Sequence, residues 1–237
     1  MSHFHLRIDP QIFEKFPGYV RGVVVAHGLN NGPSSPELID RLRQAEDGLR
    51  VRLSMDSLIE DPHIKSWREA FRIFGAKPSD FRPSIESLVR RVLHGDSLPS
   101  INALVDIGNI LSLKYLLPVG SHSLNHLGQD LILKVATGDE SFTAFGSERV
   151  EQPLPGEIIY AEGNIVLTRR WVWRQSNHTL TLPETTSIEF NVDGLPPVHL
   201  SQVEKACGDL MDWVKEYCGG SSRFEVLTRE HPQIELS

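Results

Sequence analysis

Apolar residues recur along the chain with two different periods, and the period changes near Pro118. From residue 34 to about residue 115 they are spaced three and four apart, as at Leu38, Leu42 and Ala45, which is the spacing of an amphipathic helix. After Pro118, apolar and polar residues alternate or apolar residues run together, which is typical of strands. The pattern therefore predicts a helical first half and a sheet-rich second half.

Local signals add elements at both ends of the chain. The first thirty residues predict a strand, a helix with Asp9 as N-cap and Pro10 at N1, and a second, β-branched strand. A last helix is predicted from Ser201, as N-cap with Glu204 at N3, to Cys218. The strands predicted after Pro118 are residues 130–136, 156–162, 164–174, 178–182, 187–192 and 223–230, with a tight hairpin at 162–164.

These elements predict an α+β fold in which the helical first half packs on a mixed or antiparallel sheet. No internal repeat and no low-complexity linker divides the sequence, so residues 1–237 are expected to form a single domain. Hydrophobic residues make up 40% of the chain, which suffices for a core without disulfides. A bond between Cys207 and Cys218 is not expected, because eleven helical residues separate them by about 16 Å.

Charge and hydropathy narrow the classes of partner. The net charge is −7, whereas proteins that coat nucleic acid carry a broad basic field, so any RNA contact is expected to be local. No segment approaches the roughly 18 apolar residues of a membrane span, and the first residues lack a secretory apolar run. A cytoplasmic protein without a membrane partner is expected.

Generic catalytic signatures are absent from the sequence: it has no GxSxG, Walker, GxGxxG, HExxH or CxxC motif. His122 and His126 lie four positions apart and, with Glu140, have side chains that can bind zinc. Their segment contains Gly, Ser and Asn, which favours a loop with surface or pocket histidines instead. Neither a metal nor a cofactor is therefore expected.

The run RRWVWRQS at 169–176 reads as a strand whose faces differ. Alternation would place Trp171 and Trp173 on one face and Arg170 and Arg174 on the other. In one interpretation the tryptophans fill the core and the arginines are solvated. In the other, Arg170 and Arg174 offer forked donors to phosphates or to a carboxylate.

Basic residues also gather at 74–91, in a chain that is otherwise acidic. Lys77 and Arg82 lie in a turn-rich segment, and Pro83 favours an extended backbone that projects Arg82. For Arg90 and Arg91 a solvated helix face is the favoured interpretation. Further on, Asn102, Asp106 and Asn109 form a polar stripe that either lines a cleft or faces water.

Five motifs in fixed order resemble a known family. They are FGAKPSDFRPSIESLVRRVL, LPSINALVDIGNILSLKYLLPVG, GDE at 138–140, PGEIIY at 155–160 and RRWVWRQS. Over about residues 60–200 the chain resembles free-standing relatives of the tRNA-editing B3/B4 domain of bacterial phenylalanyl-tRNA synthetase beta subunits. The resemblance implies the B3/B4 fold and hydrolysis of tyrosine wrongly esterified to phenylalanine tRNA. It also implies the acceptor end of tRNA as partner, with a synthetase as a second candidate partner. Nothing in the chain resembles a synthetic domain.

The resemblance also implies pocket residues. The segment PVGSHSLNH occupies the place of a loop with a pocket histidine, which points to His122, with His126 as the second choice. The segment PETTSIEF occupies the place of a strand with pocket Thr and Glu residues, which points to Thr185, Thr186 and Glu189. The bulky RRWVWR replaces a Gly-rich run of the synthetase pattern, so the amino acid recognised is left open.

The leading hypothesis is a hydrolase that acts in trans on mischarged aminoacyl-tRNA. In it, His122 and Glu189 read the amino acid, while Arg82 and Arg170 hold the acceptor end. Asn102 and Asn109 are further pocket candidates, and Lys77 and Arg174 further tRNA-binding candidates. Two alternatives remain: a non-catalytic module that binds tRNA or an amino-acid derivative, and a hydrolase of small esters or amides that does not use RNA.

Overall fold

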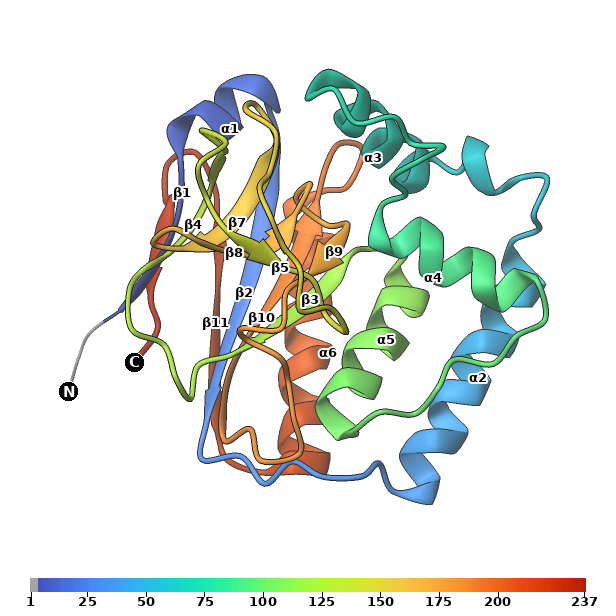
Figure 1. Cartoon of the computed structure of the whole chain (residues 1–237). Coiled ribbons are helices and arrows are strands. Elements are labelled where there is room, and N and C mark those ends of the chain that lie inside the picture. Colours follow the sequence, from blue (N-terminus) through green and yellow to red (C-terminus); the bar gives the residue numbers. More distant parts are fainter. Residues whose placement is uncertain (1–3) are drawn as a thin grey trace.

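Helices come mainly from the first half of the chain, as its pattern predicts. A computed structural model describes residues 4–237 (Figure 1). The described helices are α1 (Pro10–Lys15), α2 (Pro36–Arg52), η1 (Leu58–Glu60), α3 (Pro62–Ile73), α4 (Ser84–Leu93), α5 (Ala103–Tyr115) and α6 (Leu200–Cys218). The predicted cap at Asp9 is confirmed, because its carboxylate accepts from the backbone N–H of Gln11. The same arrangement, an oxygen-bearing cap followed by proline, begins α2 at Ser35 and α3 at Asp61.

The strands form two main sheets instead of one. A six-stranded mixed sheet has the order β12-β1-β4-β7-β8-β9, and a four-stranded antiparallel sheet has the order β11-β2-β10-β3. A small pair, β5-β6, completes the set. Their bounds are β1 (His5–Ile8), β2 (Val20–His27), β3 (Val119–Ser123), β4 (Leu131–Val135), β5 (Phe142–Thr143), β6 (Val150–Glu151), β7 (Ile158–Glu162), β8 (Ile165–Arg169), β9 (Arg174–Gln175), β10 (Ser187–Gly194), β11 (Ser221–Leu227) and β12 (Gln233–Glu235). The predicted α+β class is confirmed.

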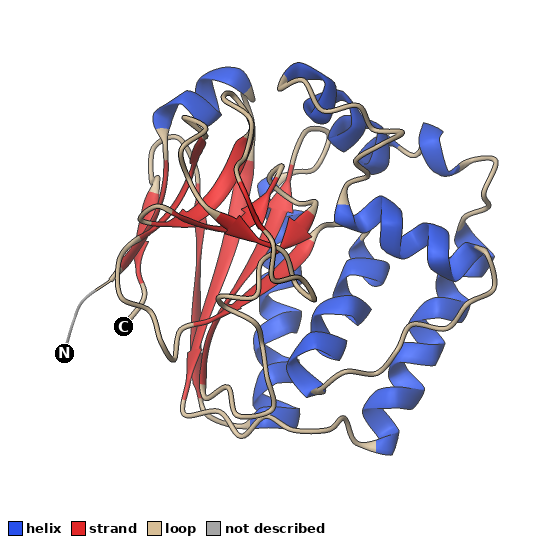
Figure 2. Cartoon of the chain, viewed as in Figure 1, coloured by secondary structure: helices blue, strands red, loops and turns tan. Residues whose placement is uncertain are grey.

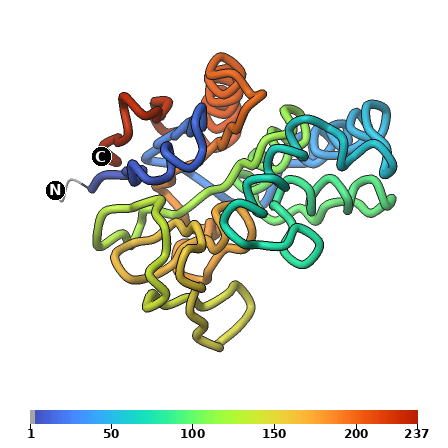
Figure 3. The backbone as a smooth tube through the Cα atoms, turned by 90° about the horizontal axis from the view of Figure 1, so that it is seen from above, coloured from blue at the N-terminus to red at the C-terminus, as the bar shows by residue number. Residues whose placement is uncertain are grey.

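Helices cover one face of the four-stranded sheet, and the six-stranded sheet covers the other (Figure 2). Helices α5 and α6 pack on the first face, and α2 packs against α5. Seen from above, the segment around residues 145–155 projects from the body on the side away from α6 (Figure 3). None of the helices in residues 4–237 has the length and apolarity needed to span a membrane.

Successive side chains of strand β10 point to opposite faces of the four-stranded sheet. Phe190 faces α5, where it lies beside the backbone of Gly108. Glu189, Asn191 and Asp193 point the other way, into the space between the sheets, and all three are buried. The molecule therefore encloses a polar layer between two sheets as well as an apolar core.

Several predicted elements need correction. The hairpin at 162–164 is confirmed by the pairing of β7 with β8, but the strand predicted at 164–174 ends at Arg169. Residues 170–173 form a turn, so the predicted alternation of Trp171, Trp173, Arg170 and Arg174 is wrong. Residues 178–182 form no strand.

Three smaller expectations also change. His122 lies on strand β3 and not in a loop, because β10 supplies backbone partners that local sequence cannot indicate. The last helix begins after His199, which forms a capping box with Gln202, so the predicted cap at Ser201 is wrong. The strand predicted at 223–230 is β11, which ends at Leu227. The strand, helix and second strand predicted at the start of the chain are confirmed. The two strands, β1 and β2, belong to different sheets.

Two glycines give a matched test of the packing of α6. A Cβ on Gly22 of β2 would lie 2.8 Å from Val203 of α6 and still closer to the Cys207 sulfur, whereas Gly48 in α2 has open space. Gly22→Ala should lower the free energy of unfolding by about 1–3 kcal/mol through overpacking. Gly48→Ala should raise it by up to about 1 kcal/mol through helix propensity. Urea unfolding measures both, and equal effects would refute the close contact at Gly22.

Candidate functional site

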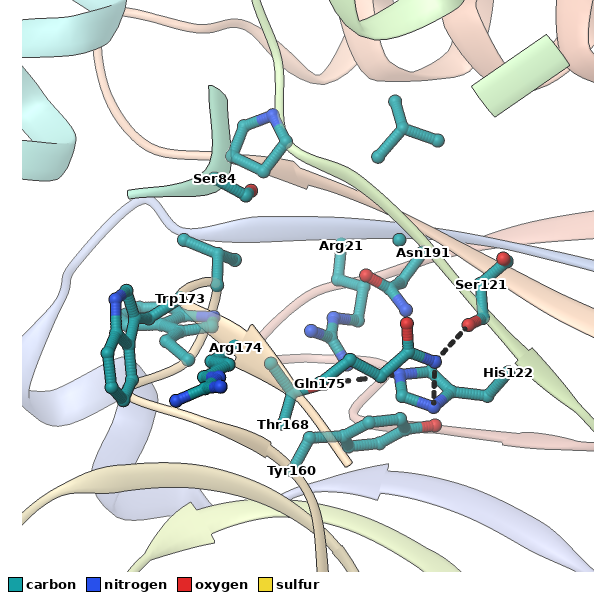
Figure 4. A pocket seen from close by; sticks show the side chains of 15 residues that line it. Arg21, Ser84, Ser121, His122, Tyr160, Thr168, Trp173, Arg174, Gln175 and Asn191 are labelled. Atoms are coloured by element: carbon teal, nitrogen blue, oxygen red, sulfur yellow. Dashed lines mark hydrogen bonds between the residues drawn. The ribbon is translucent and has the colours of Figure 1, made fainter. Parts of the chain in front are cut away.

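Two cavities meet at the edge strand β3. An inner cavity of about 170 Å³ lies between the sheets, and an outer cavity of about 540 Å³ lies between β3, α5 and the segment 180–182. The residues that line both are Val119, Gly120, Ser121, Trp173, Arg174 and Gln175. The two cavities therefore form a continuous cleft around β3, and Figure 4 shows its inner part.

The floor of the inner cavity is made by neighbouring strands in register. Asn191 pairs with Gly120, and the adjacent rows hold Arg21 with Asp193 and His122 with Glu189. A Cβ on Gly120 would lie 2.8 Å from the Asn191 side-chain oxygen. The missing side chain at Gly120 leaves space where a larger residue would fill the cavity.

Arg21 forms the deepest charged group of this floor. Its Nε and Nη2 donate to the two carboxylate oxygens of Asp193 at 2.8 and 3.1 Å, and the Tyr19 hydroxyl also donates to Asp193. Arg21 is 1% exposed and Asp193 is fully buried. The third nitrogen of the Arg21 guanidinium, Nη1, is buried without a hydrogen-bond partner among the described residues.

His122 is held beside this pair in its neutral form. Its Nδ1 lies 2.7 Å from the Thr179 hydroxyl, and its Nε2 lies 3.3 Å from the Thr168 hydroxyl. Burial, with the nearby Arg21 guanidinium as a second cause, lowers the pKa of His122 from 6.5 to about 3. His122 can therefore orient a ligand by hydrogen bonding but carries no charge near neutral pH.

Glu189 lies beneath the cavity and does not line it. It accepts a hydrogen bond from the Tyr160 hydroxyl at 2.9 Å and one from the Asn191 amide at 3.3 Å, and its other oxygen has no hydrogen-bond partner within residues 4–237. Burial raises the pKa of Glu189 to about 7, although Arg21 and these hydrogen bonds act in the opposite direction. Glu189 thus supports Tyr160 and Asn191, which do line the cavity.

The turn at 170–173 makes one wall of the inner cavity. Arg170 and Trp171 both have positive φ, 48° and 65°, a strained conformation for residues with a Cβ. Glu157 holds the turn by ion pairs to Arg169 at 2.6 Å and to Arg170 at 3.0 Å. Trp171 is buried against Trp67, with ring centroids 5.0 Å apart. Tertiary contacts therefore compensate the strain and fix the wall.

The histidines do not assemble with Glu140. Glu140 lies 2.7 Å from the Lys134 ammonium, while His122 is enclosed by threonine hydroxyls. Within residues 4–237, no three His, Cys, Asp or Glu side chains gather in a way that could hold a metal ion.

Comparison with known proteins adds the family. The family model described as "B3/4 domain" matches residues 66–219, which is more than half of the chain. The chain belongs to the B3/4 domain family. A crystal structure of an N-terminal fragment of the phenylalanyl-tRNA synthetase beta subunit from Pyrococcus horikoshii is similar, with a TM-score of 0.48 and 12% sequence identity. The match covers 94% of this chain and 51% of that chain, so this chain spans about half its length. No curated protein matches the sequence.

Within the B3/4 domain, the structure separates the predicted pocket residues. His122 lines the inner cavity, and Asn109 lines the outer one. His126 and Thr185 line a third, small cavity, and Thr186 is exposed beside it.

Asn102 has a structural role. It caps α5 by accepting from the backbone N–H of Val105, donates to the carbonyl of Thr181, and is buried. It lines neither cavity of the cleft, so the polar stripe predicted with Asn109 does not face one site.

The predicted tRNA-binding residues are also divided. Arg174 is exposed and lines both cavities, and Arg82 and Lys77 are exposed on the segment before α4. Arg170 is 5% exposed, pairs with Glu157, and stacks 3.6 Å from the centroid of the Phe81 ring. Its assignment as a phosphate-binding residue is wrong, because the turn at 170–173 directs its side chain inward.

Sequence reasoning missed Arg21, Tyr160, Gln175 and Asn191, which line the inner cavity. Arg21 lies outside the part of the chain that the B3/4 model matches. A signal was present: one arginine interrupts the apolar run YVRGVVVA, and a buried charge needs a partner. The partner, Asp193, is 172 positions away and is not indicated by any local pattern.

Glu189 should make stability depend on pH. Its pKa rises from 4.5 in the unfolded chain to about 7 in the folded one, so the folded state retains the proton longer. Between these two pKa values, the free energy of unfolding of the wild type should fall as pH rises. The fall should be about 3 kcal/mol larger than any change in Glu189→Gln over the same range. The lowered pKa of His122 acts oppositely, since its stabilisation is lost as pH falls from 6.5 toward about 3.

Urea unfolding of the wild type and Glu189→Gln across this pH range isolates the contribution of Glu189, because His122 is common to both proteins. Glu148→Gln, a change at an exposed carboxylate, is the control and should run parallel to the wild type. A constant difference between wild type and Glu189→Gln at all pH values would contradict the raised pKa.

Proposed function

We propose that this B3/4 domain protein hydrolyses mischarged aminoacyl-tRNA in trans, with the aminoacylated 3′ end of the tRNA in the cleft around β3. The observation that carries the proposal is the division of the cleft into two connected cavities of unequal size. The smaller inner cavity suits an acyl group, and the larger outer cavity suits the terminal nucleoside. Family membership supports the same assignment.

The charges near the cleft fit a local contact with RNA. Arg174 lies where the two cavities join, and Arg82 follows Phe81, whose ring packs 5.0 Å from that of Trp173 in the cavity wall. Both arginines are exposed. Exposed guanidinium groups beside a cleft can bind the phosphates that precede the terminal nucleoside, while the chain's net charge of −7 disfavours contact elsewhere.

The chemistry requires little from the protein. Water adds to the ester carbonyl, and the tetrahedral intermediate expels the ribose oxygen, which takes up a proton. Neutral groups such as His122, Thr168 and Gln175 can orient the ester and the water, and orientation alone lowers such barriers by several kcal/mol. The vicinal hydroxyl of the terminal ribose lies beside the ester and can relay the proton.

One observation favours a binding module as the second candidate. Within the part of the chain that the structure describes, no acidic side chain lines either cavity, and His122 is a weak base because its pKa is about 3. A protein-derived general base is therefore lacking among the lining residues. Binding without turnover of aminoacyl-tRNA would support this candidate over the hydrolase.

A deacylation panel tests the proposal. Purified protein should release the amino acid from at least one mischarged tRNA, and the panel should include tyrosine on phenylalanine tRNA. Hydrolysis of small amino-acid esters at the same rate as the matching aminoacyl-tRNA would instead indicate an esterase that does not use RNA. No release from any member would exclude hydrolysis.

Arg174→Ala should weaken tRNA binding and reduce the slope of log affinity against log salt by about 0.7, the value for one phosphate contact on a single strand. Arg229→Ala, at an exposed arginine between β11 and β12, is the matched control and should leave the slope unchanged. Equal slopes for the wild type and Arg174→Ala would remove Arg174 from the RNA contact.

The source of the chemistry can be tested separately. Deacylation should be unaffected by chelator, whereas tRNA ending in the matching deoxyadenosine should bind normally and react at least about 100-fold more slowly, as expected for loss of acid–base assistance. Equal rates on both substrates would show that protein groups suffice. Loss of activity in chelator, restored by zinc, would show that a metal takes part.

A further inference from the structure

The charged residues that line the cleft are all cationic. Arg21 and Arg174 are the charged side chains among the residues lining the inner cavity, and Arg174 is the one that lines the outer cavity. The chain as a whole carries seven more negative than positive charges. A cleft without a lining carboxylate in an acidic protein favours a ligand with negative charge.

One guanidinium nitrogen of Arg21 has no hydrogen-bond acceptor among the described residues. Asp193 occupies Nε and Nη2 of its guanidinium in a bidentate pair, and this pair holds the group rigidly. Nη1 is buried, has no partner among the described residues, and belongs to a side chain that lines the inner cavity. Burying a charged N–H group without a hydrogen-bond acceptor costs free energy. A ligand whose acceptor atom enters the cavity and pairs with this group recovers that free energy.

The surroundings of Arg21 suit an anion in two further ways. Figure 4 shows its guanidinium among Tyr160, Thr168, Gln175 and His122, all of which are neutral or, for His122, held neutral. Ser84, the first residue of α4, also lines the cavity, and α4 lacks a side-chain cap at its N-terminus. The backbone N–H of Ser84 donates to the Val172 carbonyl at 2.7 Å, so this helix end adds its partial positive charge but not this first N–H.

We propose that the inner cavity is a carboxylate-binding site in which one carboxylate oxygen accepts a hydrogen bond from Nη1 of Arg21. A carboxylate matches a single unpartnered guanidinium nitrogen at the bottom of a small cavity. A phosphate, with three anionic or acceptor oxygens to satisfy, would need more buried donors than this floor offers.

The binding site stands independently of hydrolysis, but its biological ligand rests on the proposed function. If the acyl group of an aminoacyl-tRNA enters the inner cavity, its α-carboxyl is already esterified. The carboxylate must then be in the side chain. The substrate class is therefore an acidic aminoacyl ester, aspartyl or glutamyl.

Binding of small probes tests the site without tRNA. The probes are the α-carboxamides of L-glutamate, L-glutamine, L-methionine and L-tyrosine, whose α-carboxyl is masked as in an ester, together with inorganic phosphate. Calorimetry should show the glutamate probe binding at least about tenfold more tightly than the methionine probe, which corresponds to one charged hydrogen bond. The side-chain resonances of ¹⁵N-labelled Arg21 should shift on binding.

Two variants locate the site. Arg21→Lys keeps a positive charge opposite Asp193 but loses the planar fork, so the preference for the glutamate probe over the methionine probe should disappear. If Arg21→Lys does not fold, Gly120→Ala provides the second test, because its Cβ occupies the floor beside Asn191, whose side-chain atoms are its nearest neighbours. Gly120→Ala should weaken binding of the glutamate probe, whereas Arg229→Ala should leave that binding unchanged.

The outcomes separate this inference from the proposed function. Equal or tighter binding of the methionine, tyrosine or phosphate probe, or no binding of the glutamate probe up to its solubility limit, would overturn the carboxylate site. An unchanged preference in Arg21→Lys would do the same, and where Arg21→Lys does not fold, so would unchanged binding of the glutamate probe in Gly120→Ala. A confirmed preference without deacylation of glutamyl- or aspartyl-tRNA would retain the site and reject acidic aminoacyl-tRNA as the substrate, whereas the proposed hydrolysis is rejected only when no member of the panel is deacylated.

Discussion

The ion pair between Arg21 and Asp193 is the interaction on which the site depends. Both side chains are buried between two sheets, where removing two charges from water costs several kcal/mol each. The bidentate geometry and the Tyr19 hydroxyl recover that cost, and loss of one partner from such a pair typically costs about 3–5 kcal/mol. Because the pair joins opposed residues of β2 and β10, it also fixes the register of the strands that form the cavity floor.

A cavity exists here because alternation places small or polar residues between the sheets. Strand β10 points Phe190 toward α5 and Asn191 toward the six-stranded sheet, while β3 contributes Gly120 beside Asn191. On the other face, Gly22 lets α6 approach β2 closely. Glycine therefore serves opposite purposes on the two faces, since it permits close packing against a helix and leaves space against a sheet. The edge position of β3 then opens that space to the surface through the outer cavity.

Local pattern was sufficient for most helices and for the hairpin between β7 and β8, because caps, prolines and periodicity act within a few residues. Local pattern failed where the conformation depends on residues that are distant in the sequence. The run at 169–174 alternates like a strand, yet the pairs from Glu157 to Arg169 and Arg170 hold a turn with positive φ. His122 was identified through resemblance to a family and not through its surroundings, and the resemblance placed it in a loop although it lies on β3. Arg21 was missed, because its meaning depends on Asp193 at the far end of the chain.

The protonation states of the residues in the polar layer determine the electrostatic potential that a ligand in the cavity experiences. His122 is neutral because burial lowers its pKa to about 3, and Glu189 is protonated below about pH 7 because burial raises its pKa. Asp193 is matched by Arg21, whose Nη1 remains unpartnered. The layer is therefore close to neutral in net charge, although it contains two buried atoms without a partner among the described residues, Nη1 of Arg21 and one oxygen of Glu189. A neutral floor with a buried, unpartnered donor can bind an anion without the repulsion that an ionised Glu189 would add. Ionisation of Glu189 above about pH 7 should therefore oppose the same ligand.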